Sequence, residues 1–114
     1  MAVNKYIEEL LAPVKLPLAY RQFIPYENNP VPNPPYLIYL VDNETGRGAD
    51  GKNLVLRKGV TIELYTDEKN VELEEKVENA ISEYEYEKNE VYISSEEMYM
   101  IYYNFEIFEK IRRQ

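Results

Sequence analysis

The chain has 114 residues, a formal net charge of -8, and neither cysteine nor histidine. This length predicts one domain over residues 1–114, and the lack of cysteine excludes disulfides and cysteine-ligated zinc. Without histidine, the commonest general base and transition-metal ligand is missing as well, so we expect no metal and no cofactor.

The first predicted elements are a short helix over residues 4–12 and a strand over residues 16–24. Apolar residues recur at helical spacing in the first segment, where Asn4 can cap the helix and Pro13 can end it. Apolar residues alternate in the second segment, which predicts a strand. Pro17 has no amide hydrogen to donate, so we expect this strand to lie at an edge of the sheet or to begin there.

The middle of the chain is predicted to contain two strands joined by a loop. Five of the eleven residues in 25–35 are proline, so this segment should be stiff, extended and unable to join a sheet. We expect it to cross the end of the sheet or to dock on a neighbouring subunit. The apolar run 36–41 predicts a central strand, and the three glycines of 42–52 predict a flexible loop. Residues 53–66 predict a long strand with a bulge or bend at Gly59.

The clearest helix is predicted over residues 70–83, with Asn70 as its cap and one apolar stripe along its length. Residues 84–93 alternate as a strand, with a turn expected around Asn89, and a break follows at the next two serines. Residues 98–107 predict a final strand with strict period-two alternation. One of its two faces comprises Tyr99, Ile101, Tyr103, Phe105 and Ile107.

The predicted order α-β-β-β-α-β-β indicates an α+β domain with a mainly antiparallel sheet and two helices on one face. The second face of such a sheet is often partly open. The first ten residues lack the pattern of a signal peptide, and no apolar run approaches the ~18 residues of a membrane span. We therefore expect a soluble, cytoplasmically made protein.

The charge distribution and the tyrosine content each have a functional and a simpler explanation. From Asp67 to Glu90 there are ten acids and three bases, whereas Glu44 to Lys58 holds two acids and four bases. Ends of opposite charge suit subunits that meet head to tail, although acidic residues also simply keep a protein soluble. The 12 tyrosines favour one extended contact surface, with strand preference and core edges as the alternative explanation.

Motifs for catalysis are not found in the sequence. The glycines at 46, 48 and 51 lack the setting of a phosphate-binding loop, and the two adjacent serines more plainly mark a turn. Asp42, Glu44 and Asp50 could hold a hard cation, but their spacing is not that of an EF-hand. Nothing singles out a catalytic pair of carboxylates, so we expect a protein that is not an enzyme.

The order and spacing of several runs resemble a known family. These runs are Pro34–Tyr39, Asp42-Asn43, Ala49-Asp50, Val60–Thr66, Leu73–Glu78, Tyr92-Ile93 and Glu96–Tyr99. Together they resemble the small tail-terminator, or tail-completion, proteins of long-tailed bacteriophages and of prophages in Gram-positive bacteria. The resemblance covers almost the whole chain and rests on order and spacing, without one diagnostic motif.

The resemblance implies a virion structural subunit that is assembled in the cytoplasm of the bacterial host. Such subunits form a ring, expected to be a hexamer, which caps the tail tube and provides the surface for joining head and tail. The implied partners are further copies of the chain, the tail tube protein and the head–tail connector proteins. DNA would pass through without specific binding, and neither a membrane nor a catalytic residue is implied.

Candidate contact residues come from the proline-rich crossing, the glycine-containing loop and the final strand. They are Tyr26, Pro34, Pro35, Tyr36, Arg47, Asp50, Lys52, Tyr99, Tyr103 and Phe105. Two alternatives stay open. One is another phage neck or minor capsid protein, such as a head-completion factor, and the other is an acidic protein-binding module or DNA-mimic inhibitor.

Overall fold

The computed structural model describes residues 3–25, 30–49 and 53–112. These residues form an α+β fold with two α-helices, one 3-10 turn and five strands. In chain order the elements are α1 (Val3–Leu11), η1 (Ala12–Val14), β1 (Leu18–Tyr20), β2 (Tyr36–Ala49), β3 (Asn53–Thr66), α2 (Val71–Ala80), β4 (Glu87–Ile93) and β5 (Met98–Arg112). The predicted α+β class and the order α-β-β-β-α-β-β are confirmed.

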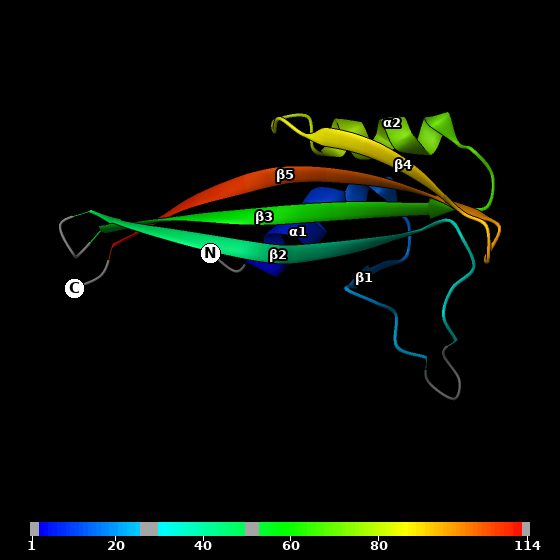
Figure 1. The fold of residues 1–114 in the computed structure, drawn as a ribbon, viewed down its shortest axis with the longest axis horizontal. Helices are drawn as coiled ribbons and strands as arrows, with labels where there is room; N and C mark the ends of the chain where they lie inside the picture. Colours follow the sequence, from blue (N-terminus) through cyan, green and yellow to red (C-terminus); the bar gives the residue numbers. More distant parts are fainter. Residues whose placement is uncertain (1–2, 26–29, 50–52, 113–114) are drawn as a thin grey trace.

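The strands form one sheet in the order β1-β2-β3-β5-β4. Neighbouring strands are antiparallel except β1 and β2, which are parallel, so the sheet is mainly antiparallel as predicted. The long strands β2, β3 and β5 continue past the helices as a narrow three-stranded extension (Figure 1). This extension makes the molecule elongated, with principal dimensions of 51 × 34 × 26 Å.

The core lies between one face of the sheet and both helices. Tyr39, Ile62 and Tyr103 pair across β2, β3 and β5, and each is at most 1% exposed. Ile7 from α1 and Val77 from α2 pack against this face, and burying a side chain of this size contributes about 1.5–3 kcal/mol. The core comprises Ile7, Leu11, Val14, Leu37, Tyr39, Val60, Ile62, Leu64, Val77, Ile81, Ile101, Tyr103, Phe105 and Ile107. Figure 1 shows α1 crossing behind the sheet, and neither helix covers the opposite face.

Of the two predicted helix N-caps, one is confirmed and one is wrong. Asn70 caps α2 as predicted, because its side-chain oxygen accepts a hydrogen bond from the backbone N–H of Leu73 at 3.1 Å. The cap predicted at Asn4 is wrong, since Val3 is already helical and a capping residue must precede the first helical turn. Helix α2 ends at Ala80 rather than at residue 83, and a turn leads from it towards β4.

Strand β1 is shorter than predicted, with three residues in place of the nine expected over 16–24. The chain leaves the sheet at Arg21, which adopts a left-handed conformation with φ of 67°. Two backbone hydrogen bonds bracket the strand, from Leu37 N–H to the Pro17 carbonyl at 2.8 Å and from Arg21 N–H to the Tyr39 carbonyl at 3.0 Å. The edge position expected from Pro17 is confirmed.

The flexible loop predicted over 42–52 is wrong for residues 42–49, which belong to β2. Pairing of these residues with β3, which pairs in turn with β5, outweighs the weak strand preference of glycine. The bulge expected at Gly59 lies instead on the opposite strand, where the register shifts between Val41 and Asn43. Gly59 leaves room there, since a Cβ would lie 2.9 Å from the side-chain nitrogen of Asn43.

Strand β5 follows the predicted alternation, whereas β4 is exposed along almost its whole length, and neither strand has the predicted ends. The turn expected at Asn89 is wrong, because β4 pairs with β5 without interruption from Glu87 to Ile93. The break at the serines is confirmed as a turn over residues 94–97. Strand β5 continues to Arg112, five residues past the predicted end, because β3 pairs with it along its whole length.

Candidate interaction surface

The sheet face opposite the helices carries aromatic and aliphatic side chains at one end. Tyr36, Tyr65 and Met100 are register partners across β2, β3 and β5, and the next row of this face holds Ile38, Glu63 and Tyr102. These side chains are partly or largely buried against one another. With Glu96 from the turn before β5 they form what we call the face patch: Tyr36, Ile38, Glu63, Tyr65, Glu96, Met100 and Tyr102.

Aromatic contacts hold the face patch together. The rings of Tyr36 and Tyr65 stack with centroids 4.9 Å apart and planes inclined by 24°. Phe23, from the segment after β1, meets Tyr36 edge-on with centroids 5.3 Å apart. Offset and edge-on arrangements are the favoured geometries for such rings. The patch is therefore an ordered apolar surface of the kind enriched at protein interfaces.

Glu63 places a carboxylate among these apolar side chains. Burial raises the pKa of the Glu63 carboxyl, although a 3.0 Å hydrogen bond from the Tyr65 hydroxyl acts in the opposite direction. Among the side chains that the structure describes, no lysine or arginine forms an ion pair with Glu63. A partly buried carboxylate without a cation is unfavourable, and a cation from outside the chain would relieve the penalty.

Glu96 brings a second negative charge to the same end of the sheet. Burial, and then the charges of Glu96 and Glu63, raise the pKa of the Tyr36 hydroxyl. Burial, Glu63, Tyr36 and Glu96 also raise the pKa of Tyr65. Both hydroxyls therefore stay protonated at neutral pH, and the patch presents two carboxylates beside two hydrogen-bond donors.

The three-stranded extension carries the opposite charge on the same face. We call residues 43–49, 53–58 and 106–112 the arm. The register places Arg47, Val55 and Lys110 in one row of the arm and Phe108 in the row before it. Phe108 is 64% exposed and Val55 is 36% exposed. Among the described residues Arg47 and Lys110 have no ion-pair partner, whereas Arg57 is 3.0 Å from Glu106.

Two sheet edges are left without a strand partner in the described part of the chain. Strand β1 pairs with β2 only as far as Tyr39, and β4 pairs with β5 only as far as Asn104. The outer edges of β2 and β5 beyond these residues present backbone N–H and C=O groups in rows. Exposed edges of this kind are templates for pairing with another chain.

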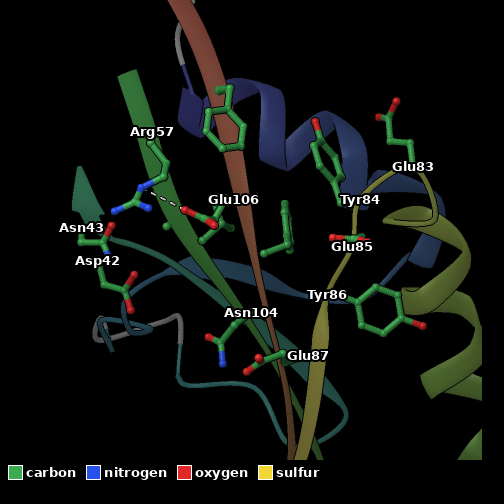
Figure 2. A pocket seen from close by; sticks show the side chains of 14 residues that line it. Asp42, Asn43, Arg57, Glu83, Tyr84, Glu85, Tyr86, Glu87, Asn104 and Glu106 are labelled. Atoms are coloured by element: carbon green, nitrogen blue, oxygen red, sulfur yellow. Dashed lines mark ion pairs between the residues drawn. The ribbon is translucent and has the colours of Figure 1, made fainter. Parts of the chain in front are cut away.

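A hollow of about 1150 Å³ lies beside the free edge of β5 (Figure 2). The segment that leads into β4 contributes Glu83, Glu85 and Glu87 to its wall. Arg57 is the one base among the lining residues, and its Nε is paired with Glu106. The hollow is open and acidic, so it suits a cationic surface better than a phosphate or a carboxylate ligand.

A polar cluster ties α2 to β4 and β5. Glu74 is only 2% exposed, and its carboxylate lies 2.8 Å from the Lys69 ammonium and 2.9 Å from that of Lys88. Burial opposes ionisation, but hydrogen bonds from Lys69 and Lys88 hold the pKa of Glu74 below its usual value. Lys88 also pairs with Glu78 at 2.8 Å, and Glu78 accepts a 2.7 Å hydrogen bond from the Tyr103 hydroxyl. The charged and polar groups of this cluster are paired with one another, so we assign the cluster a role in stabilising the fold and not in binding a ligand.

Several of the predicted contact residues lie where a partner can reach them. Tyr36 belongs to the face patch and Arg47 to the arm. Pro34 and Pro35, joined by a cis peptide bond, are half-buried just before β2. Tyr99 is half-buried against Tyr92, with ring centroids 5.0 Å apart. Three predicted residues lie outside the described ones, namely Tyr26, Asp50 and Lys52.

The prediction of Tyr103 and Phe105 as contact residues is wrong for the folded chain. They are 0% and 3% exposed and point towards the helices, where Phe105 stacks on Tyr84 with centroids 4.8 Å apart. Alternation separates the two faces of a strand but does not say which face the helices cover. Sequence reasoning also missed Phe108, because it ended the last strand at Ile107.

Comparison with known protein families and with curated proteins does not identify a relative of this chain. No model of a known protein family matches the chain, and a search among curated proteins finds no significant match. Neither of the helices in the described residues is long and apolar enough to cross a membrane. In the same residues, no group of three or more acidic side chains is placed to hold a metal ion.

Proposed function

We propose that this chain is a structural subunit of a long-tailed bacteriophage or prophage, which caps the tail tube as a ring and provides the surface for joining the head. The observation that supports this proposal is the pair of unlike surfaces at opposite ends of one sheet face. A cyclic ring needs a heterologous interface, in which one patch on each subunit meets a different patch on the next. The acidic face patch and the basic arm meet that requirement.

The unpaired strand edges support assembly as well. A solitary domain normally blunts such edges with charge, bulges or a covering segment. Here β2 carries one bulge, but its edge and that of β5 continue well into the arm. Further strands or loops, from a neighbouring subunit or from the tail tube protein, could pair there.

The charge balance fits a ring through which DNA passes without binding. Proteins grip DNA mainly by neutralising phosphates with lysine and arginine, and a net charge of -8 opposes this. The cations of the arm would be neutralised by ion pairs or by contact with another copy, and would not be available to bind DNA. A ring whose inner surface proved basic would contradict this part of the proposal.

The deciding experiment is electron microscopy of particles made without this gene. We expect over-long or ragged tail tubes and separate filled heads, and we expect a copy of the gene supplied in trans to restore joined particles. Particles of normal length and composition would overturn the proposal. Other phage neck or head-completion proteins remain the nearest alternative. Gold labelling would separate the two, because a tail terminator marks the tail–neck boundary.

The acidic hollow favours one further candidate, an acidic protein-binding module or DNA-mimic inhibitor. Glu83, Glu85 and Glu87 line it and concentrate negative charge there, which a basic protein surface would meet favourably. Binding of the purified chain to a basic nucleic-acid enzyme, weakening steeply with added salt, would support this candidate. Loss of that binding in a triple Gln variant of these residues would place the contact in the hollow.

A further inference from the structure

We propose that the face patch is covered by the arm of a second copy of this chain. The inference rests on the proposed function only in taking the chain to be a self-assembling subunit, and its test needs no virion. Charge and apolar content both indicate a second copy as the occupant. The face patch holds Glu63 and Glu96 without a described cation beside them, and the arm holds Arg47 and Lys110 without a described anion.

The apolar parts of the two surfaces also match. Phe108 is 64% exposed on the arm, with Val55 in the next row of the same face. The face patch offers the stacked rings of Tyr36 and Tyr65. An exposed phenylalanine beside Lys110 fits an aromatic surface beside carboxylates, with apolar contact at the centre and charges at the rim.

A single chain cannot make this contact with itself. Glu63 and Val55 lie eight residues apart on the continuous strand β3, which separates them by about 26 Å at the rise of a strand. Both surfaces lie on the same face of one sheet, so the arm cannot fold back without breaking β3. A second molecule is therefore required.

The contact can repeat in two ways. In a head-to-tail arrangement each copy uses its arm on one neighbour and its face patch on another, and the series can close into a ring. In a two-fold arrangement the same contact forms twice and stops at two copies. The particle mass separates these arrangements, and either one satisfies the docking proposal.

The test uses the full chain with exposed residues changed, so that folding is preserved. Arg47→Glu and Phe108→Ser alter the arm, and Glu96→Arg alters the face patch. Lys76→Glu and Tyr92→Ser make matching changes on side chains that lie off the open face. Sedimentation and light scattering over a concentration series would give the association constant, and circular dichroism would confirm the fold.

We expect each arm or patch variant to weaken association by more than about tenfold, because like charges then face one another or the apolar contact is lost. The two control variants should associate as the wild type does. A mixture of Arg47→Glu and Glu96→Arg chains should regain association, since the reversed charges complement each other. Unchanged association in the three variants, or equal loss in the controls, would overturn the docking proposal. A wild-type chain that stays monomeric at millimolar concentration would also overturn it, yet would leave the proposed virion role to the particle experiment.

Discussion

Glu63 is the residue at which stability and assembly conflict. Burial raises the pKa of its carboxyl, so the ionised form destabilises the folded monomer above that pKa, and the effect disappears below the unfolded value of about 4.3. We expect Glu63→Gln to raise the free energy of unfolding at neutral pH, because the amide keeps an acceptor for Tyr65 without the charge. Urea unfolding at neutral pH and near pH 4 would measure the difference, which should shrink in acid.

The same variant should associate less well than the wild type, if the carboxylate receives a cation from another copy. If Glu63→Gln stabilises the monomer and also weakens self-association, the weaker association cannot be due to unfolding of the variant. A lower free energy of unfolding for Glu63→Gln would show that Glu63 already has a compensating interaction within its own chain.

Glu74 is the opposite case, a buried carboxylate with two lysines of its own. Because its folded pKa lies below the usual value, its contribution is present above the unfolded pKa and is lost as pH falls through the folded pKa. Lys69 and Lys88 are each partly exposed and can rehydrate, so Glu74→Ala should cost about 1–3 kcal/mol at neutral pH. Thermal or urea unfolding would measure this cost.

The neighbouring Glu75 supplies the control, since it is exposed on the same helix. Glu75→Ala should change the free energy of unfolding by no more than about 0.5 kcal/mol. Equal effects of the two substitutions would mean that the cluster does not tie α2 to the sheet as its distances indicate.

At the level of elements, the start of α2 depends on one side chain. Asn70 accepts the hydrogen bond from Leu73 N–H, and the helix it caps carries Val77 and Ala80 into the core. Asn70→Ala should destabilise the chain by about 0.5–2 kcal/mol, measured by urea unfolding. Asn70→Asp should retain most of the stability, because a carboxylate is an equally good cap and favours the helix N-terminus. Equal losses in both variants would argue against capping as the cause.

Local sequence patterns predict an element correctly where its packing in the fold agrees with those patterns. The stripe of α2 and the alternation of β3 and β5 report directly which residues share a face, so the core residues Val77, Ile62 and Ile101 could be read from the sequence. The arm could not, since it depends on pairing between distant segments. From local sequence alone, the glycines at 46 and 48 predict a loop, yet both pair with β3.

The candidate site was only half accessible to sequence reasoning for the same physical reason. Glu63 and Tyr65 are two residues apart, so alternation in a strand puts them on one face, but the absence of a described cation beside Glu63 is a property of the assembled sheet. Phe108 is exposed because it lies on the sheet face that neither helix covers, and no local pattern shows which face of a strand the helices will cover.

At the scale of the whole molecule, the net charge of -8 opposes association while the local charges of arm and face patch favour it. Salt distinguishes these effects. Charges further apart than a Debye length, about 10 Å at 0.1 M, are largely screened, whereas the charge pairs of the arm–patch contact would lie closer together than that. The repulsion between whole subunits acts over longer distances than the arm–patch contact. We therefore expect self-association to strengthen as salt rises from low to physiological concentration and then to level off. Light scattering at several salt concentrations would measure this trend. Self-association that weakens steadily from the lowest salt upwards would contradict this prediction, because it would show that long-range attraction dominates. Such attraction is expected between an acidic inhibitor and a basic enzyme, but not between copies that each carry the same net negative charge.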